Sequence, residues 1–196
     1  PSTGQGRETV TATAFLGARL LPGTEIWLNP ELAQGFGLNR SFGIAGFPNG
    51  DASKAGNRWP REYVARAFLR QTIDLDGERV FVPTETNQLS GSYSSRRLVI
   101  TAGKLAVGDV FGDNRYSRDA RTQFMNWSLL EAGAWDFASD ARQYTWGGAV
   151  ELILGDYALR YGSFTMPTRY NPPETTWHGF GSLHHVVELA REHVIA

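Results

Sequence analysis

The sequence predicts an all-β fold, an antiparallel transmembrane β-barrel, and three features of the chain support this. Apolar and polar side chains alternate over long runs, of which Glu62–Leu75 is the clearest. Successive side chains of a strand point to opposite faces, so such a run has one apolar face and one ionic face. The ionic face of this run carries arginine twice, at Arg66 and Arg70. Between the runs, short turn signals alternate with long loops, as in outer-membrane barrels.

The first half of the chain is predicted to hold three long strands, because alternation is nearly unbroken in each. The first two are joined by a proline–glycine turn signal and therefore form a hairpin. A long glycine-rich loop separates this hairpin from the third strand. In order, these elements are Glu8–Leu21, Pro22-Gly23, Glu25–Glu31, Gly35–Arg61 and Glu62–Leu75.

The second half repeats this rhythm of strands, short turns and long connections. Strands are predicted at Arg79–Val82, Arg96–Val107, Arg142–Leu154, Tyr157–Met166 and Leu183–His193. The turns are Asp76-Gly77 and Gly155-Asp156, and the loops are Pro83–Ser95, Gly108–Ala141 and Pro167–Ser182. Within the longest loop, Thr122–Ala134 is expected to be either a short helix over the pore mouth or an irregular insertion.

Composition excludes several classes of protein. The net charge is −1 and no basic cluster is present, so nucleic acid is not an expected partner. Cysteine is absent, which rules out thiolate metal sites and suits an oxidising compartment. No apolar run approaches the ~20 residues of a membrane helix, but a barrel needs none. Residues 1–196 are read as one domain without a linker, and we expect an export signal to have been removed.

Aromatic residues near the strand ends fit the interfacial girdles of a membrane barrel. Five of them lie on the predicted lipid face, at Tyr63, Tyr144, Trp146, Tyr157 and Tyr161. The alternative is that aromatic residues simply favour strands.

Several blocks of the chain resemble the carbohydrate-selective porins of the OprB family. They are Pro30-Glu31, Gln34–Gly37, Ala45–Gly50, Asn87–Gly91, Thr101–Lys104, Asp109–Tyr116, Asp119–Trp127, Gly133–Asp136 and Arg142–Gly147. The resemblance implies a barrel of roughly sixteen strands in the outer membrane of a Gram-negative cell. About seven or eight strands are expected in this chain. We therefore expect a fragment that covers the N-terminal half to two-thirds of the barrel and stops inside the strand Leu183–His193.

Strand parity predicts which side chains face the lumen of the barrel. Arginine donates through a planar fork and carboxylates accept, so both can bind the hydroxyls of a sugar. The candidates for the pore constriction are Trp27, Glu31, Arg66 and Arg70. The further lumen-facing residues are Arg19, Glu25, Asn29, Asp74, Arg97, Glu151 and Arg160. For any one of them the alternative is that its charge only solvates the lumen or pairs with a neighbouring strand.

No metal site or cofactor is predicted. A set of loop residues with oxygen ligands, Asp109, Asp113, Asn114, Arg115 and Asp119, invites a calcium interpretation. Their spacing does not match an EF-hand, and a role in rigidifying the loop by hydrogen bonds is favoured. His184 and His185 are adjacent on a strand, so they point to opposite faces and cannot bind one metal ion together.

The predicted function is passive, sugar-preferring diffusion of small carbohydrates such as glucose through an outer-membrane porin, which is not an enzyme. Membrane lipid and lipopolysaccharide would surround the barrel, and the oligomeric state stays open. The alternatives are a general-diffusion porin and a soluble β-sandwich that binds carbohydrate. An enzyme could use Glu25 and Glu31 as acid and base, but on one strand they would lie roughly 20 Å apart, too far for a glycosidase.

Overall fold

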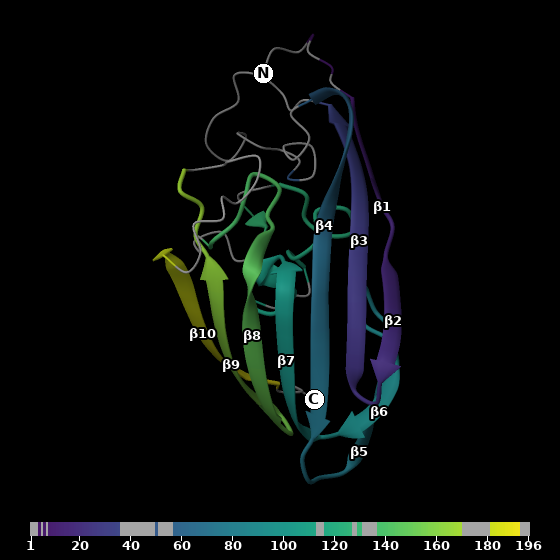
Figure 1. Cartoon of the computed structure of the whole chain (residues 1–196), viewed down its shortest axis with the longest axis vertical. Coiled ribbons are helices and arrows are strands. Elements are labelled where there is room, and N and C mark those ends of the chain that lie inside the picture. Colours follow the sequence, from purple (N-terminus) through teal and green to yellow (C-terminus); the bar gives the residue numbers. More distant parts are fainter. Residues whose placement is uncertain are drawn as a thin grey trace.

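The computed structural model describes residues 4, 6, 8–35, 50, 57–112, 116–126, 129–130, 137–169 and 181–192. Eight strands form one curved antiparallel sheet, and two more form a small separate ribbon (Figure 1). The strands are β1 (Thr9–Thr13), β2 (Leu16–Leu21), β3 (Thr24–Gly35), β4 (Asn57–Asp74), β5 (Arg79–Val82), β6 (Gly91–Ser94), β7 (Arg96–Leu105), β8 (Thr145–Leu154), β9 (Tyr157–Thr165) and β10 (Leu183–Arg191). In this described part of the chain, no helix has the length and apolar character needed to cross a membrane.

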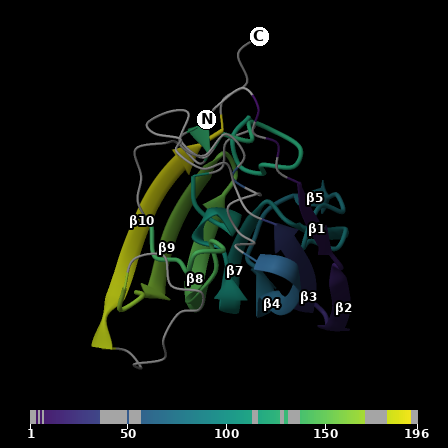
Figure 2. The same ribbon diagram turned by 90° about the horizontal axis from the view of Figure 1, so that it is seen from above.

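The strand order confirms the all-β, antiparallel prediction. Neighbours run β1-β3-β4-β7-β8-β9-β10, with β2 also paired to β3, and every pairing is antiparallel. Among the described residues the sheet does not close into a barrel, because β1 with β2 forms one edge and β10 forms the other. Seen from above, the strands follow an arc from β2 to β10 (Figure 2).

The convex face of the sheet is apolar in every long strand. Exposed aliphatic side chains project from it at Leu28, Leu69, Ile100, Val150, Leu159 and Leu189. The residues between them on β3 are buried on the concave side, among them Glu25, Trp27 and Asn29. This is the predicted arrangement of a lipid-facing outer surface and a polar inner surface.

The first predicted strand is interrupted in the structure. Glu8–Leu21 was expected to be continuous, but it forms β1 and β2 with a break at Ala14 and Phe15. The register against β3 is the same on both sides of the break, since Thr13 pairs with Glu31 and Leu16 with Leu28. In that register Ala14 lies opposite Pro30, whose carbonyl accepts a 3.0 Å hydrogen bond from the Ala14 amide. Proline has no amide hydrogen to return, so the ladder loses a bond at this point.

A β-bulge in β4 overturns the predicted orientation of Tyr63. The register of β4 against β3 shifts between Asn29 and Pro30, which leaves Ala65 without a partner residue. One extra residue reverses the faces beyond it. Tyr63 therefore turns inward and its hydroxyl donates to Glu31, whereas Arg66 and Arg70 stay on the inner face as predicted. The strand is also longer than expected, because residues 57–61 belong to β4 and not to the preceding loop.

The remaining aromatic residues of the predicted girdle divide between the two faces. Tyr157 and Tyr161 are exposed on the convex face of β9, as expected. Trp146 is half-buried within β8. Tyr144 was predicted to face lipid, but it precedes β8 and is buried on the inner side, where its ring packs 6.2 Å from that of Tyr63.

The connection between β4 and β7 also differs from the prediction. Pro83–Ser95 was expected to be a polar loop, but Gly91–Ser94 forms β6 and pairs with β5. The resulting hairpin begins at the end of the sheet that carries the short turns Pro22-Gly23 and Gly155-Asp156 (Figure 1). The described residues of Thr122–Ala134 contain no α-helix, and the rest of that segment lies outside the described residues.

We expect that Leu69→Arg lowers the free energy of unfolding in lipid vesicles by about 2–4 kcal/mol, because it places a charge near mid-depth in the bilayer. Leu69 is exposed on the convex face and pairs with Ala102 near the middle of β7. Leu75→Arg is the matched control: it follows the end of β4 and should cost only about 0–1 kcal/mol. Equal stabilities of the two variants in reversible denaturant titrations would contradict a lipid-facing convex surface.

Candidate pore constriction

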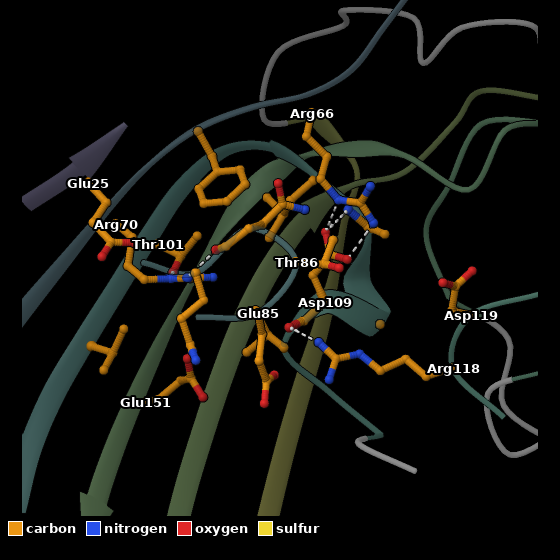
Figure 3. Close-up of a pocket in the computed structure, with 18 of the residues that line it drawn as sticks. Glu25, Arg66, Arg70, Glu85, Thr86, Thr101, Asp109, Arg118, Asp119 and Glu151 are labelled. Atoms are coloured by element: carbon orange, nitrogen blue, oxygen red, sulfur yellow. Dashed lines mark hydrogen bonds and ion pairs between the residues drawn. The ribbon is translucent and has the colours of Figure 1, made fainter. Parts of the chain in front are cut away.

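A polar cavity of about 660 Å³ lies on the concave side of the sheet. Its wall comes from β3, β4, β7, β8 and β9, and two connecting segments close it on the inner side. We call residues 75–95 the inner hairpin, and the described residues 106–112 and 116–126 the inner loop. Figure 3 shows Glu25, Arg66, Arg70 and Glu151 on the wall, Glu85 and Thr86 on the inner hairpin, and Asp109, Arg118 and Asp119 on the inner loop. Charges of both signs therefore face the same space.

The tip of the inner hairpin is held by two residues of the wall. Arg70 donates from Nη1 to the carbonyl of Asn87 at 2.7 Å, and the Asn29 amide donates to Asn87 Oδ1 at 2.7 Å. Asn87 adopts φ = 58°, a left-handed conformation that asparagine tolerates better than most residues. Glu85 and Gln88 bridge each other through two backbone hydrogen bonds of 3.1 Å, which closes the turn. The tip is thus a defined turn fixed against β3 and β4.

Further contacts fix the body of the inner hairpin. Arg19 on β2 donates to the Ser90 carbonyl at 2.7 Å and reaches Glu25 at 3.4 Å. Glu25 also accepts from the Trp27 indole at 3.1 Å. Asp74, at the end of β4, accepts from the Ser94 amide at 2.8 Å and pairs with Arg79. The predicted lumen residues of these strands therefore act as attachment points for the hairpin.

Arg66 attaches the inner loop in the same way. Its guanidinium forms a bidentate pair with Asp109, with Nε to Oδ2 at 2.7 Å and Nη2 to Oδ1 at 2.6 Å. Asp109 Oδ2 also accepts from the Ala106 amide at 2.9 Å, which caps the single 3-10 turn Val107–Asp109. The ring of Tyr144 lies 5.0 Å below the Arg66 guanidinium. Charge-assisted bidentate pairs of this kind combine strength with a fixed geometry.

The ionisation of Asp109 depends on this pair. Burial alone would raise the pKa of the carboxyl, but the Arg66 guanidinium and the Ala106 amide outweigh it and hold the pKa of Asp109 below its usual range. A folded-state pKa below the unfolded value of about 3.9 means that the stabilisation is complete above that pH. It is lost as the pH falls through the folded-state pKa, so strong acid should remove the contribution of the Arg66–Asp109 pair to the attachment of the inner loop.

Glu31 provides a second attachment for the inner loop. Its carboxylate is buried and accepts from Thr13 at 2.7 Å, from the Tyr63 hydroxyl, and from Arg121 at 3.2 Å. Arg121 also donates to Thr13 at 2.9 Å. Because the carboxylate has hydrogen bonds and a counter-charge, its burial is tolerated. Glu31 therefore links the inner loop to β1, β3 and β4 at once.

Apolar side chains of the inner loop also pack against the concave face of the sheet. Val107, Val110 and Phe111 from the loop pack with Leu105 of β7 and Phe164 of β9 in one buried cluster. The rings of Phe111 and Phe164 meet edge to face, with centroids 6.0 Å apart. Fully burying one such side chain contributes about 1.5–3 kcal/mol, so the cluster holds the loop inside the sheet independently of its ion pairs.

The wall charges of β8, β9 and β10 also pair with one another. Arg160 donates to Glu151 at 2.8 Å and pairs with Glu188. Glu188 in turn accepts from the Gly112 amide of the inner loop at 2.7 Å. Arg97 on β7 donates to the Ser94 carbonyl at 3.1 Å.

The structure brings some of the predicted site residues to the cavity and not others. The predicted residues that line it are Glu25, Arg66, Arg70, Arg97, Glu151 and Arg160. Of the four constriction candidates, Trp27 and Glu31 do not line it: Trp27 packs in the buried apolar cluster, and Glu31 is covered by Thr13, Tyr63 and Arg121. Arg19, Asn29 and Asp74 do not line the cavity themselves. Each of them contacts the inner hairpin.

Other cavity residues, among them Glu85, Thr86 and Arg118, were not predicted because they lie in connections, where alternation carries no signal. Phe15 was predicted to lie within a continuous first strand, on the same face as Arg19, and it lines the cavity from the break between β1 and β2. The block Asn87–Gly91 was noted for its resemblance, but nothing in it indicated an inward fold. The contacts of Asn87 with Asn29 and Arg70 place the tip of the hairpin against β3 and β4.

The acidic residues of the inner loop make protein contacts. Both carboxylate oxygens of Asp109 are engaged by Arg66, and Asp119 accepts from the Arg121 amide and the Thr122 hydroxyl. Asp113, Asn114 and Arg115 lie outside the described residues. Over the described ranges, no group of three metal-ligating side chains comes together. His184 is partly buried and His185 exposed on β10, in line with their predicted opposite faces.

Comparison with known proteins confirms the resemblance noted in the sequence. The family model described as "Carbohydrate-selective porin, OprB family" matches residues 3–192, which is nearly the whole chain. No curated protein and no solved structure matches the chain.

We expect Asp109→Asn to weaken the closed inner loop by on the order of 2 kcal/mol, because Arg66 loses its counter-charge while the side-chain shape is kept. Hydrogen exchange at the Ala106 and Phe111 amides measures this directly. The control is Asp119→Asn, whose carboxylate accepts only local bonds from Arg121 and Thr122 among the described residues. Unchanged protection in Asp109→Asn would show that apolar packing alone holds the loop.

Proposed function

The chain belongs to the OprB family of carbohydrate-selective porins, and on this premise we propose that it allows passive, sugar-preferring diffusion of small carbohydrates such as glucose. The family is one of outer-membrane β-barrel porins for carbohydrates. We place this protein in the outer membrane of a Gram-negative cell, with membrane lipid and lipopolysaccharide around its convex face. No cofactor enters the proposal.

The observation that carries the proposal is the mixed, largely paired charge of the cavity. Arginine and carboxylate side chains both line it, and several of their charges pair with one another, as in Arg66 with Asp109 and Arg160 with Glu151. Such a lining presents hydrogen-bond donors and acceptors without acting as a filter for ions of one sign. A neutral, hydroxyl-rich solute suits it. Release requires weak binding, in the millimolar range, about −4 kcal/mol.

An aromatic surface adds to this chemistry. Phe15, in the break between β1 and β2, lines the cavity and is 45% exposed. The C–H face of a sugar ring packs well against such an apolar ring, while its hydroxyls reach polar partners elsewhere. Phe68 and Tyr93 line the same cavity.

The open sheet supports the proposal that the chain forms one continuous wall of a larger barrel. Edge strands with unpaired backbone groups are not tolerated in a bilayer, so the edges at β1 and β10 need partner strands. With β1 and β2 taken as one interrupted strand, seven strands span the sheet. We propose that residues 1–196 act as one domain within a barrel of roughly sixteen strands, the size that leaves an aqueous channel.

A catalytic role finds no support at Glu25 and Glu31, the pair considered from the sequence. Glu31 is buried, and its carboxylate accepts hydrogen bonds from Thr13, Tyr63 and Arg121, so it has no access to a substrate. Glu25 lines the cavity, but its carboxylate accepts from Trp27 and Arg19, and Glu31 is not available as the second carboxylate. The channel is therefore proposed to work without chemistry.

Liposome swelling with the full-length parent protein tests the proposed function. Glucose should enter faster than a size-matched neutral amino acid, and a larger disaccharide should enter more slowly. Entry ordered by size alone would reduce the protein to a general-diffusion porin. No permeation by a protein shown to be folded in the vesicles would exclude a channel.

We expect Arg66→Ala combined with Arg70→Ala to relax sugar discrimination without unfolding the sheet, because both segments that narrow the cavity lose an anchor. Swelling assays should then show a smaller difference between glucose and the disaccharide. Arg61→Ala with Arg96→Ala is the matched control, since these arginines do not line the cavity. If the double variant discriminates between the sugars as well as the wild type, Arg66 and Arg70 do not contribute to the constriction.

A further inference from the structure

We propose that the tip of the inner hairpin narrows the pore from the side opposite the inner loop, and that Glu85 and Thr86 on this tip form a binding subsite for sugar hydroxyls. This inference rests on the proposed function and deepens it, because it assigns selectivity to a turn that enters from the short-turn end of the barrel. The chemical class of ligand is a neutral monosaccharide with adjacent hydroxyls.

The first argument is position. The inner hairpin leaves β4 and returns to β7 at the end of the sheet with the short turns, whereas the inner loop follows β7 at the opposite end (Figure 1). Both segments line one cavity, with Glu85, Thr86 and Gln88 on the hairpin side and Asp109, Arg118 and Asp119 on the loop side (Figure 3). A solute moving along the concave side passes between the two.

The second argument is rigidity. Asn29 and Asn87, which join the tip to β3, are both buried, and Arg70 holds the same residue through its carbonyl. The turn itself is closed by the Glu85–Gln88 bridge. A turn that is held this firmly can discriminate between solutes by shape and by hydrogen-bond geometry, because displacing it would cost a passing solute much free energy.

The third argument is unused hydrogen-bonding capacity. The charged groups of the wall are largely occupied by the protein: Arg66 by Asp109, Arg70 by Asn87 and Thr101, and Arg160 by Glu151 and Glu188. The side chains of Glu85 and Thr86, in contrast, are exposed to the cavity and have no hydrogen bond or ion pair within the described residues.

These two side chains supply complementary groups. A carboxylate accepts hydrogen bonds from two neighbouring hydroxyls, and a threonine hydroxyl both donates and accepts. Across the cavity, Arg118 on the inner loop can donate to the oxygens of the same sugar, and one of its nitrogens already donates to the Asp109 carbonyl at 3.1 Å. Acceptors on the inner hairpin and donors on the inner loop suit a sugar hydroxyl, because a hydroxyl group both donates and accepts hydrogen bonds.

Glu85→Gln in the full-length protein tests the subsite. The amide keeps the shape but removes the charge, so glucose should block the single-channel current about three- to tenfold less tightly. The reversal potential in a salt gradient should also shift toward anions, which a merely structural role of Glu85 would not produce. The matched control is Glu78→Gln, on the same hairpin but outside the cavity lining, which should change neither quantity.

A labelling experiment keeps the test independent of how the amide variant folds. Residues 1–196 contain no cysteine, so Glu85→Cys adds one thiol to this part of the folded, conducting protein, and the wild-type protein treated with the same reagent shows any reaction elsewhere. Reaction with a bulky water-soluble thiol reagent should reduce conductance and glucose flux, whereas Glu78→Cys should be insensitive. Unchanged flux after complete labelling of Glu85→Cys would overturn the placement of the tip in the pathway.

The failures of the two proposals can be told apart. Wild-type sugar preference that persists in Glu85→Gln, with unchanged glucose block, would overturn the subsite and leave the proposed function standing. A wild-type protein without any preference for glucose would overturn both. Loss of glucose block in Glu85→Gln but not in Glu78→Gln would support the subsite on the background of a sugar-preferring channel.

Discussion

The wall between lipid and water is the constraint on which this structure depends. Lipid offers no hydrogen bonds, so each strand must satisfy its backbone groups on its neighbours, and every second side chain must be apolar. Most strands of the sheet follow this alternation, and the backbone pairing is interrupted at Pro30 of β3 and at Ala65 of β4. Pro30 removes one donor and splits the first strand into β1 and β2. The bulge at Ala65 inserts one residue and turns Tyr63 inward.

The inner face of the wall is a scaffold for two inserted segments. An unpaired arginine at this depth would be costly, and the structure uses the charge as an anchor. Arg66 with Asp109 and Glu31 with Arg121 hold the inner loop, and Arg70 with Asn87 holds the inner hairpin. The apolar cluster around Phe111 and Phe164 adds a contribution that does not depend on charge. The segments that narrow the cavity are thus fixed to the strands both by ion pairs and hydrogen bonds and by apolar packing.

This arrangement separates stability from selectivity. The strands provide a rigid frame, and the residues with hydrogen-bonding capacity left for a solute lie on the connections, as is common for binding sites on scaffolds. Arg66 and Arg70 act mainly by positioning these connections, although both also line the cavity. A change at the hairpin tip can therefore alter what passes without loosening the wall.

The sequence by itself determined the all-β, antiparallel class of fold and, to within a few residues, the spans of β7 to β10. Side-chain alternation follows from backbone geometry, so it can be read from neighbours in the chain. The tertiary structure decided which charges meet: Arg66 and Asp109 are 43 residues apart, and Arg121 and Glu31 are 90 apart. It also decided the bulge that reversed Tyr63 and the fold of residues 75–95 toward the cavity. Contacts over such separations depend on register and on the packing of connections, for which a local pattern carries no signal.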